Sequence, residues 1–400
     1  MNDFKKNMLM NVVTLITDGD WIESKDQSDE GIRLVQTGNI GEGKYLDKKN
    51  NAKYINEETF IRLKCTEIFE GDVLISRLPT PVGRACIIPK ADARMITAVD
   101  CTILRFNNEI CLPQYFVYYS QSPVYLQQIA KHLYGSTRVR ISRKNLESIW
   151  VPVPPIDVQK QIAKTLDTAS ELLSMRKQHL AELDNLIKSV FYDMFGDLAF
   201  NNYNWKVDRL VEACAKSDDI KCGPFGTQLK KDDYQDKGVP LWGIPHINSF
   251  FSIPTREFIT EEKAASLEAY SIIEHDITMS RKGNVGKCAL YPGNLSDGIM
   301  HSDVLRIRLD QAIANPIFML HQLHFSNYIQ NQIKLVSSGA IMAGVNVTKL
   351  KNIFVHVPPI ELQNQFAGIV TKIEEQKTLV KQSINEAQYL FDSLMSEYFE

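Results

Sequence analysis

Two basic loops hold the side chains that could bind an anionic ligand. The first, "KHLYGSTRVRISRK" at 131–144, contains five Lys or Arg and no acid. Such groups neutralise phosphates, and arginine also pairs with the O6 and N7 edge of guanine. A solvated surface loop is the competing interpretation. The candidates in this run are Ser136, Thr137, Arg138 and Arg140.

The second loop, "KCGPFGTQLKK" at 221–231, combines glycines with lysines. Its backbone amides and ammonium groups suit phosphate, and its Thr and Gln side chains suit base edges. A flexible surface turn is the alternative. The candidates are Lys221, Thr227, Gln228 and Lys230.

A Ser-Arg pair occurs twice, at 76–77 and 280–281, each time followed by polar residues and glycines. These loops either face a nucleic acid or form tight strand–loop–strand turns in which Arg caps carbonyls. Because the Ser-Arg pair is shared, structural or backbone work is favoured for it, and the unshared polar residues are better candidates for base reading. The set is Arg77, Thr80, Arg84, Arg281, Lys282, Asn284 and Lys287.

Further hydrogen-bonding residues follow β-like runs or lie in "DGDWIESKDQ" at 18–27. Satisfied loop residues are the alternative for all of them. Trp21 and Trp242 are expected in the core. The remaining candidates are Lys25, Gln36, Asn39, His246 and Asn248.

No motif for catalysis is found in the sequence. "GNVGKC" at 283–288 has the wrong spacing for a phosphate-binding P-loop and lacks Ser or Thr after Lys. The Asn/Asp-Pro-Pro-aromatic signature of adenine methyltransferases, a dinucleotide loop and a His/Cys metal cluster are also missing. The seven cysteines form no CxxC pair. We therefore expect a non-catalytic chain with no cofactor or metal of its own, located in the cytoplasm.

The candidate loops sit in a sequence that is written twice. "VPVPPIDVQKQIAKTL" at 151–166 matches "VHVPPIELQNQFAGIV" at 355–370, and "GDVLISRLPTPVGRACIIP" at 71–89 matches "HDITMSRKGNVGKCALYP" at 275–292. Each copy begins with short β-rich runs separated by Gly and Pro turns, which predicts a compact mixed α/β domain. Each copy then continues without proline, which predicts a long helix.

The proline-free segments carry apolar residues at alternating spacings of four and three. The first seam runs from Ile162 to Met194 and the second from Phe366 to Tyr398, broken only by Arg176 and Lys377. This spacing keeps one helix edge against a partner helix. The Pro-Pro pair before each segment blocks helix upstream, and the acid that follows suits a helix N-terminus.

These patterns predict an α+β protein. Two pseudo-twofold-related α/β domains, the target-recognition domains of the family that the sequence resembles below, are expected to be separated by a long antiparallel two-helix coiled coil. We expect domain 1 at 1–155, a central spacer helix at 156–197, domain 2 at 198–358 and a C-terminal spacer helix at 359–400. The domains carry slightly more basic than acidic side chains, 20 against 18 and 17 against 16, whereas the helices are acidic.

The sequence resembles the specificity subunits of type I restriction–modification systems. The resemblance rests on the two "VPPI(D/E)xQxxxA" openings with their long helices, on "GPFGTQLKKDDY" at 223–234, and on the paired "DVLISR…VGRACI" and "DITMSR…VGKCAL" segments. It covers essentially the whole chain, in the family's order of domain, helix, domain, helix. The first loops differ between the halves, and the run at 131–144 has no strong counterpart around 334–351.

This resemblance implies a subunit that reads a bipartite sequence in double-stranded DNA, one half with each domain. It also implies two methyltransferase subunits docked on the chain and restriction (translocase–nuclease) subunits joined to them, with S-adenosylmethionine, ATP and Mg²⁺ bound by those partners. The alternative is a duplicated scaffold that holds proteins rather than DNA. A protein-binding scaffold gives no reason why two domains of the same fold should carry polar loops of different sequence.

Overall fold

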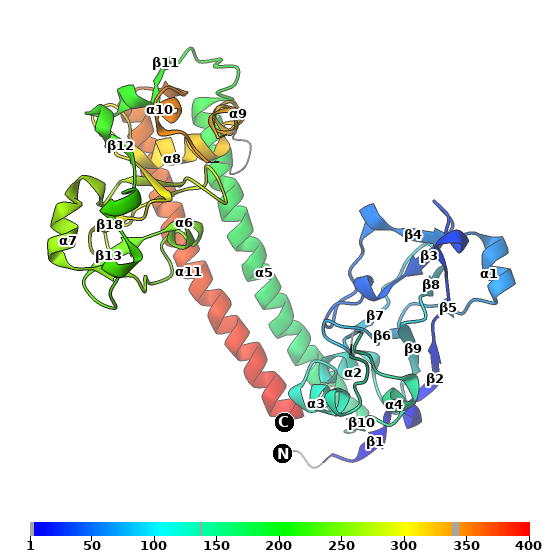
Figure 1. The fold of residues 1–400 in the computed structure, drawn as a ribbon. Coiled ribbons are helices and arrows are strands. Elements are labelled where there is room, and N and C mark those ends of the chain that lie inside the picture. The colour runs from blue at the N-terminus through cyan, green and yellow to red at the C-terminus, as the bar shows by residue number, and fades with distance from the viewer. Residues whose placement is uncertain (1–3, 137, 338–343) are drawn as a thin grey trace. The chain divides into compact units, whose positions relative to one another are not determined.

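The computed structural model describes residues 4–136, 138–337 and 344–400. The chain divides into two compact units: unit 1 comprises Met1–Lys177 and Gln382–Glu400, and unit 2 comprises Gln178–Lys381. Each unit therefore contains one β-rich domain and a part of each of two long helices (Figure 1).

Unit 1 contains two four-stranded sheets. The first is antiparallel, and its order is β2 (Val13–Asp18), β9 (Cys101–Phe106), β6 (Val73–Ser76) and β7 (Ala85–Ile87). The second has the order β4 (Lys53–Ile55), β3 (Ile32–Val35), β8 (Met95–Thr97) and β5 (Glu67–Ile68), with β3 and β8 parallel. Strands β3, β6 and β8 are buried along their whole length, which explains their lack of polar alternation.

A short ribbon and four helices complete the domain of unit 1. Strand β1 (Lys6–Met8) pairs with β10 (Trp150–Pro152), which leads directly into the first long helix. Helices α2 and α3 each begin at a proline, where the missing N–H costs nothing. The helices are α1 (Glu57–Leu63), α2 (Pro113–Tyr119), α3 (Pro123–Lys131) and α4 (Arg143–Glu147).

Unit 2 repeats this topology strand for strand, which confirms the duplication predicted from the sequence. Its sheets have the orders β12-β19-β16-β17 and β14-β13-β18-β15, and its ribbon is β11-β20. The strands are β11 (Lys206–Arg209), β12 (Ile220–Cys222), β13 (Val239–Trp242), β14 (Phe258–Ile259), β15 (Ser271–Ile272), β16 (Ile277–Ser280), β17 (Cys288–Leu290), β18 (Gly298–Met300), β19 (Val304–Ile307) and β20 (Phe354–Val357). The helices are α6 (Ile244–Asn248), α7 (Glu261–Ser266), α8 (Pro316–Phe325), α9 (Asn327–Val336) and α10 (Val347–Leu350).

The two long helices are α5 (Ile156–Phe195) and α11 (Ile360–Phe399), with 40 residues each. In unit 1, Ile162 and Leu166 near the start of α5 share a core with Met395 and Phe399 at the end of α11. The start of one helix therefore packs against the end of the other.

The same antiparallel arrangement is found in unit 2. Ile187 and Phe191 near the end of α5 share a core with Phe366 and Val370 near the start of α11. The predicted seam residues Ile162 and Leu166 of α5 and Phe366 and Val370 of α11 lie in these two cores. Towards the end of α5 the fully buried residues are Phe191 and Phe195, one position after the predicted seam residues, because a 3.6-residue turn drifts from a strict heptad.

Each long helix is joined to its domain by one completely buried glutamine. In unit 1, Gln159 Oε1 accepts from the Leu112 N–H at 2.9 Å, and its Nε2 donates to the Ile110 and Pro154 carbonyls at 2.9 and 2.8 Å. In unit 2, Gln363 makes the equivalent three bonds, to the Asn315 N–H and to the Ile313 and Pro358 carbonyls, at 2.9, 3.2 and 2.7 Å. The repeated phrase thus encodes a joint between helix and domain as well as a helix start.

Candidate nucleic-acid interface

The basic run 131–144 forms a narrow hairpin between α3 and α4. Tyr134 and Arg140 exchange backbone hydrogen bonds at 3.0 and 2.9 Å. Gly135 has φ of +100°, and a side chain there would collide with the Arg138 carbonyl, so the turn requires glycine. The candidate Thr137 lies outside the described residues.

The candidates in this hairpin differ in how much charge they have free. Arg138 is exposed but forms an ion pair with Asp100 at 3.3 Å. Arg140 is also exposed; its guanidinium lies 5.3 Å from the centre of the Tyr134 ring, and no carboxylate among the described residues pairs with it. Ser136 is exposed beside it. Of the two candidate arginines in the hairpin, Arg140 is therefore the one without a carboxylate partner among the described residues.

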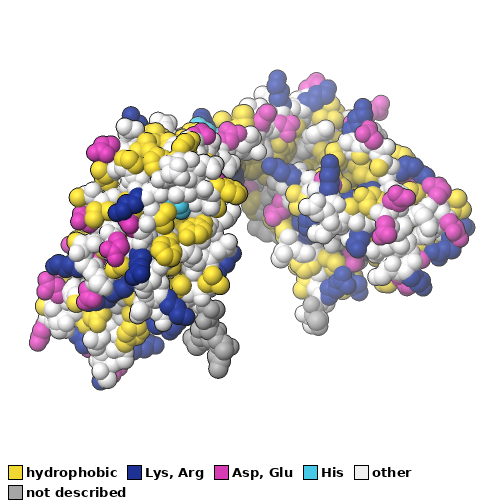
Figure 2. All heavy atoms as spheres, turned by 90° about the horizontal axis from the view of Figure 1, so that it is seen from above, with side chains coloured by type: hydrophobic (Ala, Val, Ile, Leu, Met, Phe, Trp, Pro, Cys, Tyr) yellow, Lys and Arg dark blue, Asp and Glu magenta, His cyan; other side chains and the backbone are white. Residues whose placement is uncertain are grey.

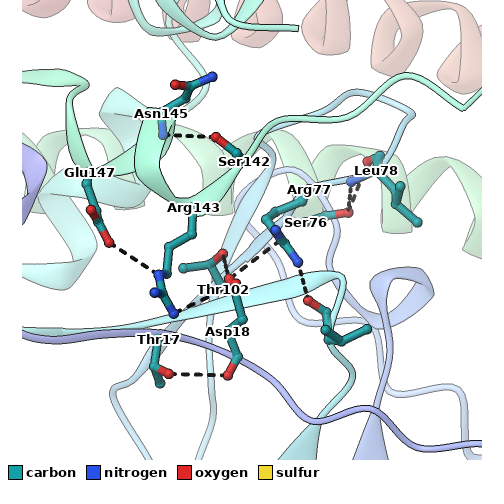
Figure 3. Close-up of polar contacts among 11 residues, drawn as sticks. Thr17, Asp18, Ser76, Arg77, Leu78, Thr102, Ser142, Arg143, Asn145 and Glu147 are labelled. Atoms are coloured by element: carbon teal, nitrogen blue, oxygen red, sulfur yellow. Dashed lines mark hydrogen bonds and ion pairs between the residues drawn. The ribbon is translucent and has the colours of Figure 1, made fainter. Parts of the chain in front are cut away.

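Arg77, in contrast, is tied into unit 1 by a polar network (Figure 3). Its Nη2 donates to the Val99 carbonyl at 2.6 Å, and its Nε lies 3.6 Å from Asp18 Oδ1. Asp18 also accepts from the Thr102 hydroxyl at 2.9 Å and lies 3.9 Å from Arg143, which pairs with Glu147 at 3.2 Å. Arg77 thus has a structural role. The network fixes α4, and the 131–144 hairpin that precedes α4, to the sheet.

Arg84 is buried, and its guanidinium is bonded inside unit 1. It donates to the carbonyls of Thr37, Ile40, Leu78 and Pro81 at 2.6 to 2.8 Å. Burial lowers the pKa of this arginine, although the side chain stays charged. Four of its five N–H groups thus hold two loops together, which gives Arg84 a structural role.

The exposed neighbours of Arg84 remain candidates. Thr80 and Gln36 are exposed, whereas Asn39 is buried and donates to the Leu46 carbonyl at 2.9 Å. Lys25 is exposed but pairs with Glu23 at 2.7 Å, which raises the pKa of the lysine. Thr80 and Gln36 are the two of these four whose side chains are exposed and form no ion pair.

In unit 2 the glycine-rich loop follows β12 closely. A side chain at Gly223 would collide with the His301 carbonyl, so this glycine is required. Lys221 pairs with Asp218 at 3.2 Å, and Gln228 accepts from the Tyr270 hydroxyl at 3.1 Å. Thr227 and Lys230 are exposed, so this loop offers both a hydroxyl and an ammonium group to a ligand.

The Ser-Arg loop of unit 2 lies against this glycine-rich loop. The Arg281 guanidinium is stacked over the Phe225 ring, 4.7 Å from its centre. Lys282 pairs with Asp303 at 2.8 Å, and Asn284 is exposed at the tip of the loop. The structure therefore brings the two predicted loops of unit 2 together.

The other unit 2 candidates lie around α6. Lys287 donates to the Asn248 carbonyl at 2.8 Å and lies 4.9 Å from the centre of the exposed Phe250 ring. Asn248 is exposed, but His246 is buried; its Nδ1 accepts from the Gly243 N–H at 3.0 Å, and burial lowers its pKa. His246 therefore supports α6, while Lys287 and Asn248 can face a ligand.

Two aromatic residues were misjudged or missed in the sequence. Trp242 is 4% exposed, as expected for the core, but the expectation for Trp21 is wrong, because it is 70% exposed. Asp20 turns inward to accept from the Thr66 N–H, and the next side chain therefore points out. Phe225 is 46% exposed at the corresponding place in unit 2. Its 204-residue spacing from Trp21 was the signal that could have identified this pair.

Charge is mixed rather than gathered on these domains. Basic and acidic side chains are interspersed on the face of both units seen in Figure 2. Among the residues the structure describes, no cluster of three or more His, Cys, Asp or Glu could hold a metal, and no helix is long and apolar enough to cross a membrane.

Comparison with known families identifies the duplicated unit. The type I restriction–modification DNA specificity domain matches residues 2–185 and again 204–389. The chain belongs to this family. It is a specificity protein with two recognition domains, and its family is non-catalytic, in agreement with the lack of a catalytic motif in the sequence.

Relatives of the whole length exist. The chain is 21% identical over 407 residues to a protein named as the MjaX type I restriction enzyme specificity subunit of Methanocaldococcus jannaschii, covering 96% of this chain and 91% of that one. It is 22% identical over 294 residues to the EcoBI specificity subunit of Escherichia coli, covering 68% of this chain and 61% of that one.

Solved structures share the fold of this specificity protein. The S subunit of a type I restriction–modification system from M. genitalium aligns with a TM-score of 0.60 at 16% identity, covering 100% of this chain and 97% of that one. A chain from work on the assembly and conformational transition of the type I system aligns equally well, with 98% of it covered.

Proposed function

We propose that this chain is the DNA-reading subunit of a type I restriction–modification complex. Residues 1–155 and 198–358 each recognise one half of a bipartite site in double-stranded DNA. The observation that carries this proposal is one framework built twice with unlike polar loops. The sheets of the two units have the same strand order, yet the equivalent loops at 18–27 ("DGDWIESKDQ") and 222–231 ("CGPFGTQLKK") present different side chains. Like frameworks with unlike loops suit two readers of different base sequences.

The candidates whose side chains are exposed or half-buried and form no ion pair among the described residues are the proposed contacts with DNA. Cations without a carboxylate partner among the described residues suit phosphate, and neutral hydrogen-bonding side chains suit base edges. The buried Asn39, Arg84 and His246 support these loops from inside. The proposed contacts are Gln36, Thr80, Ser136, Arg140, Thr227, Gln228, Lys230, Asn248, Arg281, Asn284 and Lys287.

The long helices at 156–197 and 359–400 are proposed to set the spacing of the two halves and to dock two modification subunits. Equivalent grooves in the two units support two equivalent docking positions. In unit 1 a groove of about 450 Å³ lies between α2 and the long helices, lined by Tyr118, Gln121 and Asp167. In unit 2 a groove of about 960 Å³ lies between α8 and the long helices, lined by His321 and His324 at the matching positions.

Catalysis and its cofactors are assigned to the partners. S-adenosylmethionine would be bound by the modification subunits, and ATP and Mg²⁺ by the restriction subunits. A chain that reads DNA within such a complex also keeps the predicted cytoplasmic location.

Methylome sequencing tests the proposal directly. Cells that carry this chain and its modification subunit should show adenine methylation at one bipartite motif. Exchange of residues 198–358 for those of a relative should change one half of that motif and leave the other half intact. An undivided motif, or a change in both halves, would refute the assignment.

A protein-binding scaffold is the remaining alternative. A fluorescence-anisotropy titration of the assembled complex against salt separates the two functions, because phosphate contacts make DNA affinity fall steeply with salt. The scaffold predicts no salt-dependent, sequence-selective binding.

A further inference from the structure

Asp18 of unit 1 and Cys222 of unit 2 occupy the same place in the duplicated fold. Each ends the first strand of its sheet, β2 or β12, opposite Thr102 and Leu305 respectively. The glycine after each donates to the equivalent carbonyl, that of Cys101 at 2.8 Å or Val304 at 2.9 Å. A carboxylate in one unit is therefore replaced by a thiol in the other.

In unit 1 this carboxylate neutralises the shared arginine of the Ser-Arg loop. Asp18 lies 3.6 Å from Arg77 and 3.9 Å from Arg143, so two guanidinium groups converge on one acid (Figure 3). Arg77 also donates to a carbonyl at 2.6 Å and is only 14% exposed. The positive charge of Arg77 is therefore already neutralised within unit 1.

In unit 2 the equivalent arginine lacks every charged partner of that network. The backbone N–H of Arg281 donates to the Asp303 carbonyl at 2.9 Å, as Arg77 does to Asp100. The carboxylate of Asp303, however, pairs with Lys282. Among the described residues, the buried Nε atoms of Arg77 and Arg281 both lack a hydrogen-bond partner, but only that of Arg77 lies near a carboxylate, at 3.6 Å. The aligned position of Arg143 is Val347.

The thiol that replaces the carboxylate provides no compensating charge. Burial raises the pKa of Cys222 more than Arg281 lowers it, so the thiol is neutral at pH 7. The guanidinium carbon lies over the Phe225 ring, 4.7 Å from its centre, and that ring is itself exposed. Arg281 is thus an oriented, unneutralised cation within the proposed DNA interface.

We propose that Arg281, stacked on Phe225, binds a backbone phosphate of the DNA half-site read by unit 2, and that Asp18 closes the equivalent site in unit 1. This inference rests on the proposed function. A phosphate supplies the negative charge that the site lacks, whereas a guanine edge is neutral. The Ser-Arg pair is also common to two units with unlike loops, which suits a contact that positions DNA without reading sequence.

The test uses the assembled complex and the motif found by methylome sequencing. The slope of log affinity against log salt should fall by about 0.9 when one phosphate contact is removed, as in Arg281→Gln. Arg281→Lys should keep the slope. Cys222→Asp should reproduce the loss without touching Arg281, because it gives unit 2 the acid of unit 1, and Cys222→Ser should leave the slope unchanged.

Arg77→Gln is the matched control in unit 1. It should lower thermal stability. The slope of log affinity against log salt should equal that of the unaltered complex, because Arg77 is already neutralised by Asp18. Methylome sequencing of cells with Arg281→Gln should return the same motif as the unaltered protein. Thermal melting of each complex shows that the variants are folded.

Three results would overturn the inference. An unchanged slope with folded Arg281→Gln excludes the phosphate contact, and equal slope losses for Arg77→Gln and Arg281→Gln exclude the role of Asp18. If the motif methylated in cells with Arg281→Gln accepts more than one base at a single position, Arg281 reads that base rather than a phosphate. Failure of the proposed function looks different, because the unaltered complex would then show no sequence-selective binding at all.

Discussion

Replacement of Gln363 by alanine should cost unit 2 about 3 kcal/mol or more of unfolding free energy. The side chain makes three hydrogen bonds and is completely buried. Each bond contributes about 1 kcal/mol net, and the Asn315 N–H and two carbonyls would lose this partner, of which the Pro358 carbonyl bond is buried. Gln159→Ala should have the same effect on unit 1, because its three bonds have the same geometry.

Hydrogen exchange of the full chain, followed by mass spectrometry, can assign the loss to one unit. Gln363→Ala should accelerate exchange where α11 begins and around 313–316, and leave the start of α5 protected. The repeated phrase supplies its own control, because Gln161 and Gln365 recur at the same spacing but are exposed. Their alanine variants should stay within about 0.5 kcal/mol of the unaltered chain. Equal losses of unfolding free energy for the buried and exposed glutamines would refute the idea that the buried glutamine joins helix to domain.

Three further predictions follow from the same structure. Arg84→Ala should destabilise unit 1 by about 3 kcal/mol in urea unfolding, because four carbonyls lose their donor, whereas the exposed Thr80→Ala should be neutral. Burial lowers the pKa of His324 from 6.5 to about 4, so the unfolded state binds a proton that the folded state refuses. Stability should therefore fall by about 2 kcal/mol between pH 7 and pH 5, and His324→Asn should remove this loss. Deletion of one heptad from each helix, 173–179 and 377–383, should shorten the unspecified spacer of the methylated motif by about three base pairs. An unchanged spacer would contradict the proposal that the long helices set the spacing of the two half-sites.

The duplicated fold was predictable because its signals are local. The Pro-Pro pair, the acid after it and the apolar seam lie within each helix or next to it, so their meaning does not depend on distant residues. The deviation towards the end of α5, where Phe191 and Phe195 are the fully buried residues, is the drift of a real helix from a seven-residue repeat.

The site was less predictable because its side chains are held by distant partners. The Gln159 joint depends on the loop at 110–112, and Arg84 depends on carbonyls at 37 and 40. The sequence favoured a structural role for the shared arginine, and Arg77 has one. Arg281 differs because a strand residue 59 positions before it in the chain is Cys222 rather than an acid, a contact that spacing alone does not indicate.

Unit 1 is completed only by the last part of the chain, Gln382–Glu400. Its core includes Met395 and Phe399, and the Tyr115 ring lies 5.5 Å from the Phe399 ring. During synthesis on the ribosome, residues 1–177 emerge first but lack this cover until residues 382–400 have been made. Unit 2 is contiguous, so it can reach its native state before unit 1. A ribosome that stops before residue 382 would thus release a chain in which unit 1, not unit 2, is left unfinished.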